Sequence, residues 1–440
     1  MDREERRLRR RKDTRDAVVV LIVFAMIVAL VVAGAVFGIS KLMSGRNHTP
    51  ANGIAGADTQ ATETQETESI PQTEEPEATE AQTQTVVDPL VEQAAQIVSG
   101  MTLEEKVAQM FFITPEALTG YGQVTVAGDA TNEAYQKYPV GGLIYNSQNL
   151  VDIDQTKTMM AKMQQYADSR ISLPVFLGVD EEGGSVTRIA SNEAYWLTNV
   201  DNMSDIGATG DTQNAYQAGV TIGTYLSDLG FNLDFAPVAD VLTISDSVIG
   251  NRSFGTDSEL VASMTLSELQ GLESMGIQGV VKHFPGHGGV SGDSHSGAVS
   301  TDKSLEELFA SELVPFQRAI DGGAEFLMVG HIAAPNVTGD DTPASLSKVM
   351  ITDVLRTQMG YQGVVITDAM NMTAITANHA ADEAAVLAVN AGADMILMPE
   401  DFGKAYNGVI DAVNNGTIEE YRINEAVVRI VKAKLALSAQ

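Results

Sequence analysis

The chain contains no cysteine, a single tryptophan, and fewer than half as many basic as acidic side chains. Its 440 residues include 27 Lys and Arg against 58 Asp and Glu, which gives a formal net charge of −31. The lack of cysteine excludes a disulfide framework, a thiolate nucleophile and Cys-ligated zinc or iron–sulfur sites. The shortage of basic residues argues against a nucleic-acid partner, because phosphate binding needs a cationic face.

The few basic side chains are concentrated at the N-terminus, beside a long apolar run. Residues 1–16 hold eight Lys and Arg, and residues 17–39 carry no charge at all. A helix over that run would be about 34 Å long, enough to cross a hydrocarbon layer of about 30 Å. The basic segment should stay in the cytoplasm and direct the rest of the chain outward. A cleaved signal peptide, giving a secreted protein, is the alternative, although its apolar region usually has only about 7–15 residues.

Residues 47–88 are rich in Thr, Glu, Gln, Ala and Pro, and no Lys or Arg lies between Arg46 and Lys106. Such a tract buries too little apolar surface to offset the entropy lost on ordering, so we expect a disordered tether. From about residue 89 apolar runs alternate with amphipathic stretches. We therefore divide the chain into a basic cytoplasmic segment (1–16), a transmembrane signal anchor (17–43), a disordered linker (44–88) and one folded domain (89–440).

Eight short apolar runs in the folded domain have the pattern of buried strands: 110–115, 140–145, 175–180, 233–238, 279–284, 326–331, 363–368 and 395–399. Near-continuous apolar strands are typical of parallel sheets covered on both faces. Helical stretches separate most of them, among them 154–168, 257–275, 304–321 and 380–391. Eight β/α repeats in about 350 residues predict an α/β fold, a (β/α)8 barrel of the TIM type. The alternative is an open doubly wound sheet, but the first strand lacks a Gly-x-Gly-x-x-Gly sequence.

Polar side chains gather at the C-terminal ends of these strands, where barrels carry their chemistry. Asp180 ends the third strand, Lys282 and His283 the fifth, His331 the sixth and Asp368 the seventh. A buried charge at such a place must be paired or used.

The segment 282–295, KHFPGHGGVSGDSH, contains three of the six histidines. A His/Asp zinc site is one possibility, although Pro285 and Gly286 prevent His283 and His287 from sharing a helix face. For His287 the simpler interpretation is that its ring satisfies backbone groups. Asp293 and His295 are more informative, because an Asp two residues before a His can fix its tautomer and raise its pKa.

A carboxylate beside such a His–Asp pair suits stepwise glycosyl transfer. Asp368 would act on the anomeric carbon, and His295 would protonate the leaving oxygen. Ser294 is a poor nucleophile candidate, because it lacks the context of a nucleophile elbow.

Several motifs, in order over about residues 95–435, give the chain a recognisable pattern: GGLIYNSQN at 141–149, GVDEEGGSVTRI at 178–189, LDFAPVADV at 233–241, IGNRSFG at 249–255, KHFPGHG at 282–288, DSH at 293–295 and ITDAMNM at 366–372. Together they resemble glycoside hydrolase family 3, in its β-N-acetylglucosaminidase branch of the NagZ type. The resemblance implies that Asp368 is the nucleophile and that His295 is the general acid/base with Asp293 as its partner. It also implies a sugar-binding set: Asp180, Arg188, Arg252, Lys282 and His283. Plain salt bridges are the alternative for Arg188 and Arg252.

The chain departs from the family pattern at three positions that flank this set: Glu181, Ser185 and Ala369. The resemblance implies a retaining exo-β-N-acetylglucosaminidase acting on cell-wall (peptidoglycan) fragments or chito-oligosaccharides, with no cofactor and no metal. We further expect a monomer, held at the membrane by its N-terminal helix. The alternatives are a β-N-acetylglucosaminide phosphorylase, a β-glucosidase, and a wall-glycan-binding module without turnover.

Overall fold

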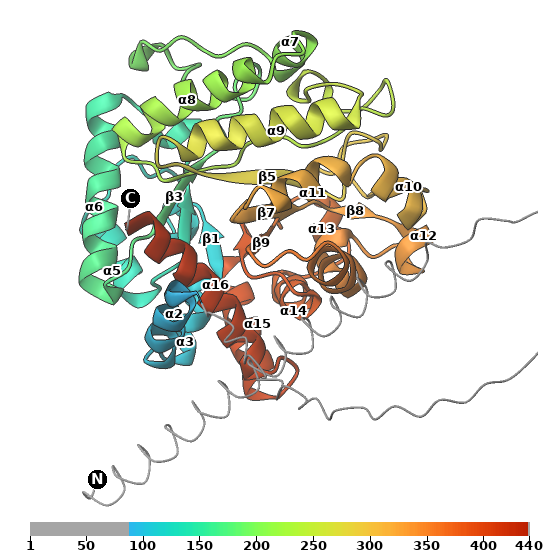
Figure 1. Cartoon of the computed structure of the whole chain (residues 1–440). Helices are drawn as coiled ribbons and strands as arrows, with labels where there is room; N and C mark the ends of the chain where they lie inside the picture. The colour runs from blue at the N-terminus through green and yellow to red at the C-terminus, as the bar shows by residue number, and fades with distance from the viewer. Residues whose placement is uncertain (1–87, 439–440) are drawn as a thin grey trace, which may run out of the picture. The chain divides into compact units, whose positions relative to one another are not determined.

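Eight parallel strands form one sheet in the computed structural model, which describes residues 88–438 (Figure 1). Their order is β10-β1-β2-β3-β4-β5-β7-β9, and every pairing within the sheet is parallel. The strands are β1 (Phe111–Ile113), β2 (Gly142–Ile144), β3 (Phe176–Val179), β4 (Leu233–Asp234), β5 (Gln278–Phe284), β7 (Phe326–Val329), β9 (Val364–Thr367) and β10 (Ile396–Leu397). Each lies within, or overlaps, one of the eight predicted apolar runs.

The sheet curves round until its two ends meet. Its end strands, β9 and β10, are joined by a single parallel bridge between Ile366 and Met395. The result is a near-closed barrel in which each strand neighbours the next one along the chain. This confirms the barrel architecture, since an open doubly wound sheet would reverse its strand order part-way.

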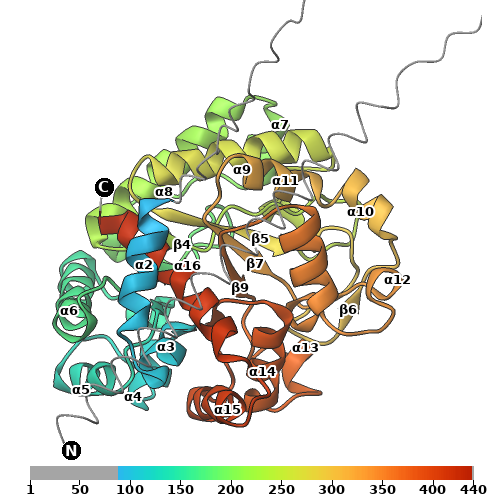
Figure 2. The ribbon, with the colours of Figure 1, turned by 60° about the horizontal axis from the view of Figure 1, so that its bottom comes forward.

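Helices surround the strands, and α8 and α9 lie side by side in both views (Figures 1 and 2). The longer helices are α2 (Pro89–Ser99), α5 (Asp129–Lys137), α6 (Ile153–Ile171), α8 (Thr212–Leu229), α9 (Ser258–Glu273), α11 (Val314–Asp321), α14 (Ala381–Ala391), α15 (Phe402–Asn414) and α16 (Glu420–Ser438). The shorter ones are α3 (Leu103–Gln109), α4 (Pro115–Thr119), α7 (Met203–Ala208), α10 (Leu305–Ala310), α12 (Pro335–Thr338) and α13 (Thr373–Thr376). A π-helical segment, η5 (Val349–Gln358), precedes β9.

The helix predicted over 304–321 is wrong in one respect, because two helices, α10 and α11, occupy it. Ser304 caps α10 in a full capping box with Glu307. Pro315 lies in the first turn of α11, a position proline favours because it has no N–H to donate into the preceding turn. The pattern search also missed a small second sheet, in which β6 (Val299–Ser300) pairs with β8 (Ile332–Ala333).

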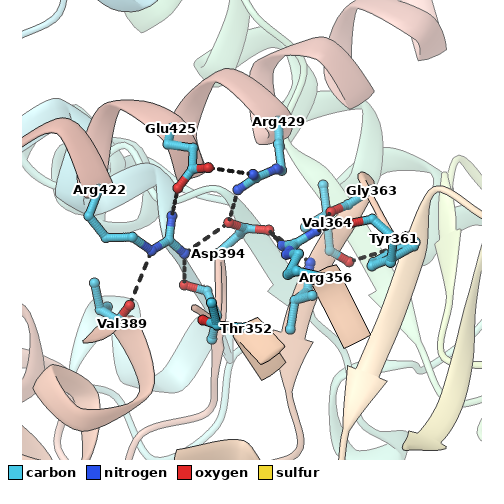
Figure 3. Close-up of polar contacts among 12 residues, drawn as sticks. Thr352, Arg356, Tyr361, Gly363, Val364, Val389, Asp394, Arg422, Glu425 and Arg429 are labelled. Carbon is cyan, nitrogen blue, oxygen red and sulfur yellow. Dashed lines mark hydrogen bonds and ion pairs between the residues drawn. The ribbon is translucent and has the colours of Figure 1, made fainter. Parts of the chain in front are cut away.

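A buried carboxylate, Asp394, lies among Arg356, Arg422 and Arg429, close to the junction of β9 and β10 (Figure 3). It lies just before β10 and accepts the N–H of Val365 in β9 at 2.9 Å. Arg422 and Arg429, both on α16, each donate to Asp394 at 3.0 Å, and Arg356 of η5 contacts it as well. The last helix is thereby fastened to the seam between β9 and β10.

The predicted basic segment, signal anchor and nearly all of the linker lie outside the described residues. Within residues 88–438, no helix combines the length and apolar character needed to cross a membrane.

Candidate active site

The polar residues predicted at strand ends do lie at one end of the barrel. Asp180 follows β3, Lys282 and His283 lie in the last part of β5, His331 follows β7 and Asp368 follows β9. Because all eight strands are parallel, these positions share the C-terminal face of the barrel.

Lys282 is the centre of an ion-pair network on this face. Its Nζ lies 3.0 Å from Oδ1 of Asp180 and 2.6 Å from Oε1 of Glu182. Glu182 also accepts two hydrogen bonds from Arg252, at 2.7 and 2.8 Å. Arg188 Nη2 lies 3.5 Å from Asp180 Oδ2. Both arginines thus form salt bridges, as the simpler alternative proposed, but they do so around Lys282 at the barrel's C-terminal face.

Glu182 is absent from the predicted site, although its side chain is only 2% exposed within this network. Burial by itself raises the pKa of its carboxyl, but Lys282 and Arg252 outweigh that effect and lower the pKa to about 2. The carboxylates in turn raise the pKa of the Lys282 ammonium against the effect of burial. Glu182, Arg252 and Lys282 are therefore all ionised near neutral pH. The sequence feature that could have pointed to Glu182 is the pair of acids, Glu181 and Glu182, directly after Asp180.

The first of those acids, Glu181, shapes the loop that follows β3. Its carboxylate accepts the backbone N–H groups of Arg188, Ile189 and Ala190 at 2.6 to 2.9 Å, and the hydroxyl of Tyr225 at 2.9 Å. Burial raises the pKa of Glu181, and these hydrogen bonds oppose the rise. Its role is to bend this loop so that Arg188 comes back to Asp180.

Glu268, on α9, is a buried carboxyl close to the same network. Gly219 and Gly271 allow α8 and α9 to approach so closely that a Cβ at either would lie 2.2 Å from a carbonyl oxygen of the other helix. Glu268 is 1% exposed, and neither carboxylate oxygen has a hydrogen-bond partner among the described residues. Burial, reinforced by repulsion from Glu182, raises its pKa to about 8.

Replacing Glu268 with Gln is expected to stabilise the protein increasingly between pH 5 and pH 8. The folded pKa lies above the ordinary value of 4.5, so the folded protein keeps a proton that the unfolded chain releases. Wild-type stability therefore falls through this window, by up to about 4 kcal/mol relative to the variant. Urea unfolding at the two pH values measures the difference. Glu306→Gln, on the exposed side of α10, is the matched control, and equal pH trends in the two variants would contradict the assignment.

His283 is oriented by Asp240, a second residue that the pattern analysis missed. The Nδ1 atom of His283 lies 2.7 Å from Oδ2 of Asp240, and Oδ1 of Asp240 accepts the N–H of His287 at 2.6 Å. Burial raises the pKa of Asp240, but the two histidines outweigh it and lower the pKa overall. The carboxylate thus holds the proton of His283 on Nδ1. The available signal was Asp240 itself, two residues after the fourth predicted strand.

The expected role of His287 is wrong, because its ring bonds a side chain and not a backbone group. Nε2 of His287 lies 3.1 Å from Oγ of Ser294. Ser294 is buried, and its carbonyl oxygen accepts the N–H of Ala374 at 3.2 Å. Ser294 is therefore held from two sides, between the two residues of the predicted dyad.

Asp368 is partly buried, and its Oδ1 accepts the N–H of Ala369 at 2.7 Å. His331 lies beside it: Nε2 is 3.0 Å from the carbonyl oxygen of Ala369 and Nδ1 is 2.7 Å from Oγ of Ser345. Burial raises the pKa of Asp368, but the imidazoles of His331 and His283, with the Ala369 N–H, lower it overall. Asp368 is therefore an ionised carboxylate at neutral pH.

Asp293 and His295 form the predicted pair, on a loop open to solvent. Oδ1 of Asp293 lies 2.9 Å from Nδ1 of His295 and also accepts the His295 N–H at 2.9 Å. That backbone hydrogen bond is the main cause that lowers the pKa of Asp293. The His295 side chain is 73% exposed, and no hydrogen bond joins it to Asp368 in the part of the chain that the structure covers.

The sequence of this loop also left open a His/Asp zinc site. Between Asp88 and Ser438, no three His, Asp or Glu side chains are grouped so that they could hold a metal ion. The structure joins His283 and His287 through Asp240, with ring centroids 6.1 Å apart.

The family model described as "Glycosyl hydrolase family 3 N terminal domain" matches residues 102–433. The chain belongs to glycoside hydrolase family 3. The matched range includes every residue of the strand-end network, Asp368 and the Asp293–His295 pair.

The chain is similar in sequence to two bacterial β-hexosaminidases. Beta-hexosaminidase LpqI of Mycobacterium tuberculosis is 36% identical over 310 residues, which cover 68% of this chain and 76% of that protein. Beta-hexosaminidase A of Pseudoalteromonas piscicida is 32% identical over 331 residues, which cover 70% of this chain but only 55% of that protein.

Among solved structures, a family 3 beta-N-acetylglucosaminidase from Paenibacillus sp. str. FPU-7 superposes with a TM-score of 0.72 at 36% identity. The match covers 77% of this chain and 64% of that one. The matched part of this chain thus spans 55% of the Pseudoalteromonas piscicida protein and 64% of the Paenibacillus protein.

Proposed function

We propose that this chain is a retaining exo-β-N-acetylglucosaminidase. It hydrolyses terminal β-linked N-acetylglucosamine from cell-wall (peptidoglycan) fragments or chito-oligosaccharides. The observation that carries the proposal is the ionised carboxylate of Asp368 at the face that also presents the Asp293–His295 pair. The β-hexosaminidase relatives support the choice of sugar.

In the first step, the Asp368 carboxylate attacks the anomeric carbon while His295 gives its proton to the glycosidic oxygen. The bond to the leaving sugar breaks, and a covalent glycosyl-enzyme forms on Asp368. Asp293 holds the imidazole through Nδ1, so Nε2 is the atom that transfers the proton.

In the second step, His295 takes a proton from water as that water attacks the same carbon. The ester to Asp368 breaks, the sugar leaves with retained configuration, and His295 carries its proton again. One residue thus serves as acid and then as base, because the same imidazole nitrogen gives up a proton and then takes one back.

The ion-pair network supplies the sugar-binding groups. The side chains of Asp180 and Arg188 are 23% and 31% exposed, so they are open to hydroxyl groups of the sugar. Lys282 and Glu182 are nearly buried beneath them and keep their charges fixed. Arg252 and His283 complete the set, held by Glu182 and Asp240 respectively.

The test uses the purified protein with an aryl β-N-acetylglucosaminide and an aryl β-glucoside, each with and without phosphate, and identifies the sugar released. Free N-acetylglucosamine, independent of phosphate, is the expected product. A sugar 1-phosphate would make the enzyme a phosphorylase, which a His acid/base allows because it does not repel phosphate as a carboxylate would. Preference for the glucoside would make it a β-glucosidase, and no release from either would favour a glycan-binding module.

His295→Ala is expected to lower kcat/KM strongly for substrates with poor leaving groups and only slightly for activated aryl glycosides. A poor leaving group needs a proton from the acid, whereas an activated phenolate departs without one, and general acid catalysis contributes about 10²- to 10⁴-fold. A series of aryl N-acetylglucosaminides of graded phenol pKa measures the dependence. The same loss across the whole series would count against the acid role of His295.

We also propose that the enzyme acts outside the cytoplasmic membrane as a monomer, anchored by a helix over residues 17–43. The support is the basic segment 1–16 followed by the uncharged run 17–39. Protease added outside intact cells is expected to remove the barrel domain while the N-terminal segment stays protected. Activity released into the medium would instead favour a cleaved signal peptide.

A further inference from the structure

The dyad residues Asp293 and His295 have few contacts of their own that could position them. The His295 ring meets only Asp293 by hydrogen bond among the described residues, and it is largely exposed. Its position therefore depends on how the segment around it, residues 290–303, is held. That segment begins after Gly289, pairs with β8 through β6 (Val299–Ser300), and ends at Lys303, just before α10.

A single buried side chain, Glu312, contacts both ends of this segment. Glu312 lies between α10 and α11, and its side chain is 1% exposed. Its Oε1 contacts Nζ of Lys303, at the C-terminal end of the segment, and accepts a hydrogen bond from the hydroxyl of Thr243 at 3.0 Å. Lys303 Nζ also lies 3.3 Å from Thr243 Oγ1, which closes a three-membered cluster.

At the N-terminal end of the segment, Glu312 packs against the backbone of two glycines, Gly286 and Gly289. A Cβ at Gly286 would lie 2.7 Å from Cβ and Cγ of Glu312, and one at Gly289 would lie 2.6 Å from its Oε1. Only glycine allows this close approach. Gly286 also has φ +125°, which a side chain would strain.

His287 lies between these two glycines in the chain, and its ring connects them to the loop that carries the dyad. Its ring is within hydrogen-bond distance of Ser294, and Ser294 lies between Asp293 and His295 in the chain. A continuous path of contacts therefore leads from Glu312 through residues 286–289 and Ser294 to the dyad. At the C-terminal end of the segment, the ion pair between Glu312 and Lys303 fixes the position of Lys303.

We infer that Glu312 and Lys303 are positioning residues for proton transfer, acting on His295 through the two ends of its segment. The inference rests on the proposed role of His295 as general acid. The hydrogen-bond and ion-pair partners of the Glu312 side chain among the described residues are Thr243 and Lys303, and neither Asp368 nor Lys282 is one of them. We therefore expect a loosened segment to displace mainly the proton donor, and small displacements of a catalytic group cost up to about 10²-fold.

The test measures kcat/KM of the full chain with the graded series of aryl N-acetylglucosaminides, for Lys303→Met and Glu312→Gln. For poor leaving groups we expect a loss of about 10-fold, and for activated ones less than about 2-fold. Lys348→Met, an exposed lysine before η5, is the matched control and is expected to leave both values unchanged. Thermal unfolding of each variant checks that it is folded.

A double-mutant cycle separates positioning from general damage. In the His295→Ala background, Lys303→Met is expected to cause no further loss, because the group that it positions is gone. Equal loss for all leaving groups, or an undiminished loss in the His295→Ala background, would overturn the inference. If His295→Ala shows the leaving-group dependence and neither Lys303→Met nor Glu312→Gln does, only this inference fails. If His295→Ala itself lacks the dependence, the acid role fails and the inference with it.

Discussion

Asp368→Asn is expected to reduce kcat on aryl β-N-acetylglucosaminides by at least about 10⁴-fold without unfolding the protein. The amide keeps the shape of the side chain and its oxygen can still accept the N–H of Ala369. It carries no charge and does not attack the anomeric carbon. Steady-state rates and thermal unfolding of the same preparation test both halves of the expectation. Asp411→Asn, an exposed residue on α15, is the control and is expected to keep full activity.

Chemical rescue distinguishes a nucleophile from a carboxylate that only stabilises charge. In Asp368→Ala, azide can enter the face that the carboxylate occupied and attack an activated β-glycoside there. The expected product is the α-glycosyl azide, formed with a rate that rises with azide concentration. A variant that keeps substantial hydrolysis, with no such product, would point to a nucleophile other than Asp368, such as the acetamido group of the substrate.

Asp394→Asn is expected to destabilise the protein by about 3–5 kcal/mol, the usual cost of removing one partner of a buried ion pair. The substitution leaves Arg356, Arg422 and Arg429 beside a neutral amide, with side chains no more than 16% exposed (Figure 3). It also loosens α16 from the seam between β9 and β10, where a single bridge closes the sheet.

The midpoint of urea unfolding at pH 7 measures this effect. Burial raises the pKa of Asp394, but the three arginines lower it overall to about 2, below the ordinary value of 3.8. Its contribution is therefore complete above about pH 4, and it is lost as the pH falls toward 2. The difference between variant and wild type should shrink in that window. Asp168→Asn, exposed on α6, removes the same charge and should change stability by less than about 0.5 kcal/mol. A similar small effect for Asp394→Asn would contradict the role of Asp394 in closing the barrel.

Local pattern was enough to predict the strands and most of the helix starts. Strands buried on both faces require continuous apolar runs, so β3 and β7 are visible as short stretches without polar interruption. Asp257 and Ser304 cap α9 and α10 at the starts of the predicted helical ranges 257–275 and 304–321, because an N-cap acts only on the next few residues. The break between α10 and α11 was missed, since Pro315 is tolerated in the first turn of a helix and does not by itself mark where that helix begins.

The site was only partly predictable for a related reason. The rule that parallel strands end on one face was sufficient to bring Asp180, Lys282 and Asp368 together. Glu182 and Asp240 were missed, because nothing in local sequence tells which of several nearby acids faces a buried Lys or His. That choice depends on the path of the loops after β3 and β4, which Glu181 and Asp240 themselves help to set.

The sequence by itself determined the class of fold, the family resemblance and the residue types of the chemistry, because these depend on periodicity and on short motifs. The tertiary structure decided which charges pair. It placed Lys282 between Asp180 and Glu182, tied α16 to the barrel through Asp394, and set Glu312 against both ends of the segment that carries His295. The physical reason is that electrostatic and steric contacts act over a few ångströms in space, between residues as distant in the chain as Asp180 and Lys282, which are 102 positions apart.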